Sequence, residues 1–190
     1  MTSPTETEVK IPLTASPDEF SKRLEKAGYA ISAPRVFESN TLYDSSDGSL
    51  RTRGVLMRLR EVGEKGVITW KGVAVPGPYK VRPEIETSVG STEKLAQILH
   101  ELGLDPQFRY EKFRTEFRKP GGAGVVTVDE TPIGNFLELE GPGDWIDEAA
   151  AELGFAVSDY VLESYGRLYQ QYCERRGIEP THMVFACAEP

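Results

Sequence analysis

Charged residues recur at alternate positions in several short segments of this sequence. Successive side chains of a β-strand point to opposite faces, so residues two apart project the same way. The first such segment places Glu6, Glu8 and Lys10 on one face and Val9 and Ile11 on the other. An ordinary surface strand of an antiparallel sheet has the same alternation. The argument for a functional site therefore depends on the other segments.

Further segments repeat this arrangement. The charged residues that share the face opposite the apolar side chains are Arg58, Arg60, Lys71, Arg82, Glu84, Glu86, Lys112, Arg114, Asp129, Glu138 and Glu140. Lys80 and Arg118 share this parity too, but either could be a solvated flank. Two like charges about 6 to 7 Å apart repel by roughly 0.6 kcal/mol in water and by about 2.5 kcal/mol at an effective dielectric of about 20. The pattern is either decoration of an open sheet face or the lining of a closed sheet, and its recurrence favours the closed sheet.

A lumen lined by these residues needs ligands that compensate its charges. Divalent cations would compensate the carboxylates, and a polyanion would compensate the arginines and lysines. Arginine matches phosphate oxygens with two parallel hydrogen bonds, and magnesium bridges carboxylate to phosphate. The pattern therefore predicts a site for a magnesium-bound polyphosphate, in which phosphoryl transfer requires mainly positioning and charge neutralisation.

The elements that position these residues follow from periodicity and from glycine and proline. The spacing of apolar residues predicts helices over 17–27, 92–102, 144–153 and 158–176. Alternation predicts strands over 5–11, 35–44, 55–61, 67–71, 79–89, 108–119, 125–130 and 136–140. Short turns between neighbouring strands predict antiparallel pairing. Beyond residue 178 the pattern ends, so we expect one α+β domain over residues 1–177 and a loosely held tail over 178–190.

Composition narrows the classes of protein. A chain of 190 residues and 21.1 kDa fits one domain. Its net charge of −8 argues against a general nucleic-acid binder. No apolar run is long enough to span a bilayer, and the N-terminus lacks the order of a signal peptide, so we expect a cytoplasmic protein without a membrane partner.

Cysteine and histidine contribute little to a candidate metal site. Cys173 and Cys187 lack the spacing of a zinc site and are expected to be reduced thiols. His100 and His182 are isolated. Any metal would therefore be held by carboxylate oxygens, which favours Mg²⁺ or Mn²⁺ over zinc.

The residues also carry a resemblance to a known family. Glu6-x-Glu8-x-Lys10 resembles the ExExK signature of the CYTH superfamily, the triphosphate tunnel metalloenzymes. The likeness continues over roughly residues 5–172 in Tyr43-Asp44, Leu56-x-Arg58-x-Arg60, Thr69-x-Lys71, Arg82-x-Glu84-x-Glu86, Lys112-x-Arg114, Asp129 and Gly134-x-Phe136-x-Glu138-x-Glu140. This resemblance implies an eight-stranded antiparallel closed β-barrel, or tunnel, with packing helices outside, which binds a triphosphate with Mg²⁺ or Mn²⁺.

The resemblance also implies roles for the individual residues. The implied phosphate-binding residues are Lys10, Arg58, Arg60, Lys71, Arg82, Lys112 and Arg114. The implied metal ligands are Glu6, Glu8, Asp129, Glu138 and Glu140, with Glu84 and Glu86 nearby as ligands or water-positioning groups. The catalytic candidates are Lys10, Arg58 and Glu138, and Glu138 would orient the attacking water.

Members of the superfamily differ in substrate, and three functions stay open. We expect hydrolysis of a small triphosphate, with inorganic triphosphate first. The alternatives are a class IV adenylate cyclase that converts ATP to cyclic AMP, and a polyphosphate-binding or nucleotide-binding module without catalysis. Leu56 stands where animal thiamine triphosphatases have a tryptophan, which argues against that subgroup. The expected partner is a small-molecule triphosphate, and a homodimer stays open.

Overall fold

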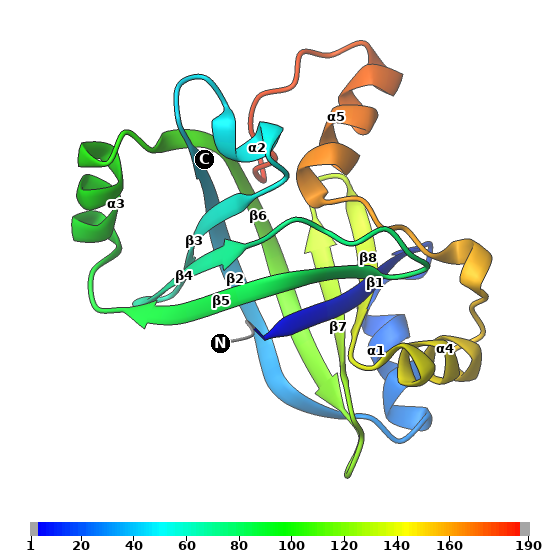
Figure 1. The fold of residues 1–190 in the computed structure, drawn as a ribbon. Helices are drawn as coiled ribbons and strands as arrows, with labels where there is room; N and C mark the ends of the chain where they lie inside the picture. The colour runs from blue at the N-terminus through cyan, green and yellow to red at the C-terminus, as the bar shows by residue number, and fades with distance from the viewer. Residues whose placement is uncertain (1–3, 187–190) are drawn as a thin grey trace.

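The computed structural model describes residues 4–186 of the chain and shows an α+β fold built on a closed antiparallel barrel (Figure 1). The strands are β1 (Thr5–Leu13), β2 (Ala30–Asp44), β3 (Leu56–Val62), β4 (Lys65–Lys71), β5 (Lys80–Val89), β6 (Asp105–Arg118), β7 (Val125–Thr131) and β8 (Gly134–Glu140). Around the barrel they follow the order β1-β5-β4-β3-β2-β6-β7-β8, and β8 pairs with β1 to close it. The predicted fold class is confirmed.

Helices lie outside this barrel. They are α1 (Pro17–Lys26), α2 (Ser49–Thr52), α3 (Thr92–Glu101), α4 (Gly143–Glu152) and α5 (Tyr165–Arg176), with a 3-10 turn at Val157–Asp159. Ser16 begins α1 with a capping box: its hydroxyl accepts from the Glu19 N–H, and the Glu19 carboxylate accepts from the Ser16 N–H. Both α1 and α4 cover the outer face of β1, β7 and β8 (Figure 1). No helix of the described residues is long and apolar enough to cross a membrane.

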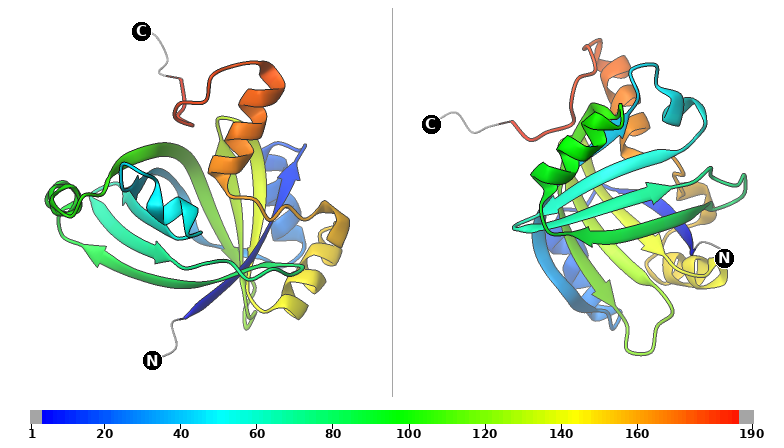
Figure 2. Two further views of the ribbon diagram at one scale, coloured as in Figure 1. Left: turned by 45° about the horizontal axis from the view of Figure 1, so that its top comes forward. Right: turned by 60° about the vertical axis from the view of Figure 1, so that its left-hand side comes forward.

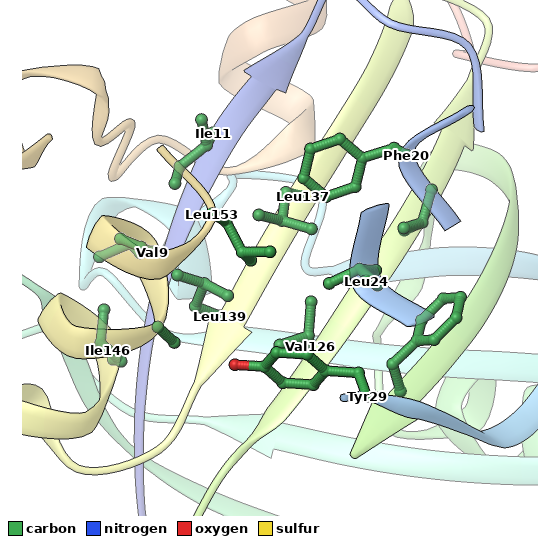
Figure 3. Close-up of a cluster of buried hydrophobic side chains, with 14 residues drawn as sticks. Val9, Ile11, Phe20, Leu24, Tyr29, Val126, Leu137, Leu139, Ile146 and Leu153 are labelled. Atoms are coloured by element: carbon green, nitrogen blue, oxygen red, sulfur yellow. The ribbon is translucent and has the colours of Figure 1, made fainter. Parts of the chain in front are cut away.

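The main hydrophobic core lies between the barrel wall and these helices (Figure 3). Its largest buried members from the strands and helices are Val9, Ile11, Phe20, Leu24, Phe117, Val126, Leu137, Leu139 and Ile146. Because the apolar side of each strand points outward to the helices, its charged side must point into the barrel. A smaller cluster under α3 contains Tyr43, Leu59 and Leu99.

The predicted helix over 158–176 is wrong in its first part. The backbone of Val161 pairs with Lys10 on the free side of β1, with N···O distances of 2.8 and 3.0 Å. This pairing holds the segment extended, and α5 begins only after Ser164, whose hydroxyl accepts from the Arg167 N–H. Tertiary pairing therefore replaces a stretch that periodicity alone assigned to a helix.

The prediction of a loosely held tail does not hold at Met183, although most side chains of residues 178–186 are exposed. Met183 is 0% exposed. Its N–H donates to the Arg109 carbonyl at 3.0 Å, and its carbonyl accepts from the Glu111 N–H at 2.9 Å. This pairing is available because β7 pairs with β6 only from Phe113 onward. Cys173 is free and buried, as expected, whereas Cys187 lies outside the described residues.

Truncation of Leu24 tests the packing of α1 on the barrel. Leu24 is 0% exposed in the main core, so Leu24→Ala should lower the free energy of unfolding by about 2–5 kcal/mol. Leu102, which directly follows α3, is 70% exposed. Leu102→Ala should change the free energy of unfolding by less than about 0.5 kcal/mol. Urea denaturation followed by circular dichroism measures both. Equal effects of the two substitutions would contradict the assigned packing.

Candidate functional site

The barrel encloses a cavity of about 500 Å³ lined mainly by charged side chains. Its basic lining residues are Lys10, Arg58, Arg60, Lys71, Lys80, Arg82, Lys112 and Arg114. Its acidic lining residues are Glu6, Glu8, Glu84, Glu86, Glu116, Glu138 and Glu140. All seven predicted phosphate-binding residues lie in this lining, together with six of the seven predicted metal ligands. The structure thus brings together residues from six strands.

The register of β1 places each of its charged residues opposite a partner of the other sign. Lys10 lies opposite Glu138 on β8. Glu8 lies opposite Lys80 on β5. Glu8 and Glu140 also lie directly opposite each other on β1 and β8. Like charges in this position destabilise a sheet, so this part of the cavity has an uncompensated carboxylate.

Ammonium groups bridge the carboxylates of the cavity. The Lys71 ammonium is 2.6 Å from the Glu6 carboxylate and 3.1 Å from that of Glu84. Lys10 lies 3.0 Å from Glu8 and 3.2 Å from Glu138. Each of these lysines thus bridges two carboxylates.

The two arginines of β3 face the same cavity and have hydrogen-bond donors without partners among the described residues. Arg58 donates to the Thr69 hydroxyl at 3.1 Å, and Arg60 donates to the Glu86 carboxylate at 3.1 Å. The Nε atoms of both arginines are buried and have no hydrogen-bond partner among the described residues. An unpaired buried donor costs free energy, so these groups are suited to bind an anion.

Asp129 differs from the other predicted metal ligands, because it lies behind the cavity wall. It is 0% exposed and absent from the lining. Its carboxylate accepts from Lys112 at 2.9 Å, from Arg114 at 2.7 Å and from the Tyr165 hydroxyl at 2.7 Å. In this structure Asp129 therefore orients basic residues.

Three further basic residues have specific positions. Arg82 lines the cavity, but its guanidinium donates to the carbonyl oxygens of Gly72 at 2.9 Å and Lys71 at 3.1 Å, so it also fixes the end of β4. Arg118 is exposed at the end of β6 and lies outside the lining. Lys80, which shared the same parity, does line the cavity and lies 2.6 Å from Glu8.

Sequence reasoning missed several residues of the site. Glu116, Tyr110 and Tyr165 line the cavity. Glu38 is buried 3.7 Å from both Arg60 and Lys112. Glu38 and Asn40 are polar residues two apart in β2, and this spacing could have indicated that Glu38 faces the lumen. The apolar Leu42 lies on the same face and obscured the polar–apolar alternation of the strand.

Comparison with known proteins identifies the family. The CYTH domain matches residues 4–163. The chain belongs to the CYTH family. CYTH proteins are enzymes that act on triphosphates, as adenylate cyclases or as triphosphatases. The resemblance seen in the sequence is therefore confirmed.

Individual relatives agree with this assignment. A Methanocaldococcus jannaschii protein named "Putative adenylate cyclase" is 26% identical over 176 residues, which cover 91% of this chain and 99% of that protein. A solved structure from Vibrio parahaemolyticus, described in the same words, has a TM-score of 0.76 at 18% identity, covering 89% of this chain and 99% of that one. HpAC1 from Hippeastrum, described as a "putative adenylyl cyclase" with a dominant triphosphatase activity, has a TM-score of 0.60 at 14% identity, covering 93% and 97%. These two solved structures share the fold.

Two carboxylates of the CYTH cavity have raised pKa values. Burial raises the pKa of Glu6 to about 7, repulsion by Glu8 adds to the rise, and Lys71 opposes it. Burial and the neighbouring Glu8 and Glu138 also raise the pKa of Glu140. The charge of each group is therefore poorly compensated without a ligand.

Two other carboxylates stay ionised. Burial alone would raise the pKa of Glu8, but the ammonium groups of Lys10 and Lys80 outweigh it and lower the pKa. For Glu138, Lys10 and Arg114 likewise outweigh burial and hold the pKa well below its usual range. These groups serve as hydrogen-bond acceptors at neutral pH, never as acids.

The carboxylates have the chemistry that Mg²⁺ or Mn²⁺ requires. Among the described residues no three carboxylates already converge as a metal cluster, because lysines lie between them. The opposed pair Glu8 and Glu140, and the raised pKa values of Glu6 and Glu140, mark where added positive charge is most favourable. Oxygen donors of this kind fit a hard divalent cation.

Substitution of Glu6 tests this electrostatic balance. Because its pKa is about 7 in the folded protein and about 4.5 ordinarily, ionisation of Glu6 opposes folding. The wild type should therefore lose stability through this group as the pH rises from 4.5 to 7. Glu6→Gln should remove this loss, so its free energy of unfolding relative to the wild type should increase by up to about 3 kcal/mol between pH 4.5 and 8.

Urea denaturation in EDTA over this pH range measures the difference. Glu64→Gln, in the exposed turn between β3 and β4, is the matched control and should show no such trend. Parallel stability curves for Glu6→Gln and the wild type would contradict the raised pKa.

Proposed function

We propose that this CYTH protein hydrolyses a small triphosphate, with inorganic triphosphate as the preferred substrate and Mg²⁺ or Mn²⁺ as the cofactor. The observation that carries the proposal is the single cavity in which eight basic and seven acidic side chains face one another. A polyphosphate and its divalent cations bring both signs of charge into such a lining. Binding then exchanges ion pairs within the protein for ion pairs with the ligand.

The basic residues would hold the phosphates. Arg58 and Arg60 offer planar donors that match phosphate oxygens, including the Nε atoms that lack partners. Lys10 and Lys71 each lie between two carboxylates and would turn to the phosphates once those carboxylates bind metal. The buried Asp129 would keep Arg114 and Lys112 oriented while the phosphates bind.

Four carboxylates of the lining would hold the metal: Glu6, Glu8, Glu138 and Glu140. The cation, when bound, supplies charge neutralisation and Lewis acidity toward the phosphates and water. Glu138 would orient the attacking water as a hydrogen-bond acceptor, because its low pKa keeps it anionic. Glu84 and Glu86, on β5, would order further water near the phosphates.

The lining favours inorganic triphosphate over a nucleotide. An adenine ring needs an apolar slot or a free aromatic face on which to stack. Tyr165 is one of two aromatic residues in the lining, and the ammonium groups of Lys10 and Lys112 lie over its ring at 5.3 and 5.4 Å from the centroid. The triphosphatase activity described for the Hippeastrum protein supports hydrolysis of a triphosphate over cyclisation.

An adenylate cyclase is the second candidate function. Leu42 and Leu56 give the cavity a small apolar area that a base or ribose would contact. The name of the Methanocaldococcus jannaschii relative supports this alternative. Here the ribose 3′-hydroxyl would take the place of water as the nucleophile.

A substrate panel separates the candidates. The purified protein is incubated with inorganic triphosphate, thiamine triphosphate or ATP, each with Mg²⁺ or Mn²⁺, and phosphate, pyrophosphate and cyclic AMP are measured. We expect phosphate release, fastest from inorganic triphosphate. Formation of cyclic AMP with pyrophosphate would establish the cyclase instead. Binding of triphosphate without turnover of any substrate would indicate a binding module.

Substitution of Glu138 tests the proposed mechanism. Glu138→Gln keeps the shape of the side chain but removes the anionic acceptor, so kcat should fall by about 100-fold or more while KM changes much less. Glu130→Gln, on the outer face of β7 where Glu130 pairs with Arg35, is the matched control and should retain full activity. Unchanged kcat in Glu138→Gln, with the fold verified by its unfolding midpoint, would remove Glu138 from the mechanism.

A further inference from the structure

Tyr165 is the first residue of α5 and lies two positions beyond the residues that match the CYTH domain. Its side chain is buried yet forms part of the cavity lining. The hydroxyl donates to Asp129 at 2.7 Å, and the same carboxylate accepts from Lys112 and Arg114. Tyr165 therefore joins α5 to the basic residues of the cavity through one carboxylate.

The ring of Tyr165 contacts the same group of residues in a second way. The Lys10 ammonium lies 5.3 Å from the ring centroid and the Lys112 ammonium lies 5.4 Å from it. Both distances are within the range of a cation–π attraction. A long lysine side chain has many rotamers, and fixing one costs about 0.5–1.5 kcal/mol on binding. The ring thus adds to the ion pairs with carboxylates that already order these two lysines.

Two rings from strands of the barrel hold Tyr165 in this place. Its ring packs edge-on against Phe136, with centroids 5.5 Å apart, and against Tyr110 at 6.0 Å. Farther along α5, Tyr169 and Cys173 join the same cluster, and the buried Met183 of the tail completes it. Figures 1 and 2 show α5 beside β6 and β8 at this end of the barrel.

We infer that Tyr165 is a positioning residue, which preorganises Lys10 and Lys112 for the phosphates through its ring and orients Asp129 through its hydroxyl. This inference rests on the proposed function for its consequence in binding, but the ordering of the lysines can be measured separately. A merely structural Tyr165 would hold α5 in place without affecting the lysines.

The first test is nuclear magnetic resonance of protein labelled in its lysine side chains. The ε-methylene protons of Lys10 and Lys112, assigned with Lys10→Arg and Lys112→Arg, should be shifted upfield by the ring. Tyr165→Leu should abolish the shifts, and Tyr165→Phe should retain them. Tyr169→Leu removes a ring one turn farther along the same helix, outside the cavity lining, and should leave the shifts unchanged.

The second test is calorimetric titration with inorganic triphosphate in the presence of Ca²⁺, a hard divalent cation that takes oxygen ligands as Mg²⁺ does. Tyr165→Leu should bind roughly tenfold more weakly, because two lysines must then be ordered on binding. Tyr165→Phe should lose less, and Tyr169→Leu should bind as the wild type does.

Several outcomes would overturn the inference. These are unshifted lysine signals in the wild type, loss of the shifts in Tyr165→Phe, or equal losses of affinity in Tyr165→Leu and Tyr169→Leu. If Tyr165→Leu does not fold, the wild type and Tyr165→Phe still decide the question. Failure of the wild type to bind triphosphate would instead overturn the proposed function, and the lysine signals would still decide the role of Tyr165.

Discussion

The enclosure of charge inside the barrel is the constraint on which the structure depends. Burying a charge is costly unless a partner compensates it. In this CYTH chain the partners are other side chains of the lumen, as when Lys71 holds Glu6 and Glu84. Glu140, which lies opposite Glu8 across β8 and β1, has no such ion pair among the described residues. The positive and negative charges of the lining thus balance closely enough for the protein to fold, and the cavity can still bind cations.

The hydrophobic core follows from the same constraint. Since the charged faces point inward, the apolar faces point outward and require a cover, which α1 and α4 supply over β1, β7 and β8. The residues that bind a ligand are therefore carried by strands, and the residues that stabilise the fold lie on the opposite side of those strands. One strand thereby has two separate tasks, divided by its alternation.

Most of the fold and of the site was predictable because a two-residue period assigns each side chain to a face. All eight predicted strands are present in the barrel. Thirteen of the fourteen predicted site residues lie in the observed cavity lining. The prediction failed where contacts between distant segments decide the conformation. Val161 is extended because it pairs with Lys10, and Met183 is fixed because β6 has a free edge.

The sequence by itself determined which residues face inward, since alternation does not depend on how the strands pair. Only the tertiary structure decided how far each residue lies from the cavity. Asp129 has the parity of a lining residue but lies behind Lys112 and Arg114, because those longer side chains reach past it. Tyr165 has no strand parity at all, and α5 brings it into the lumen through the packing of its other face.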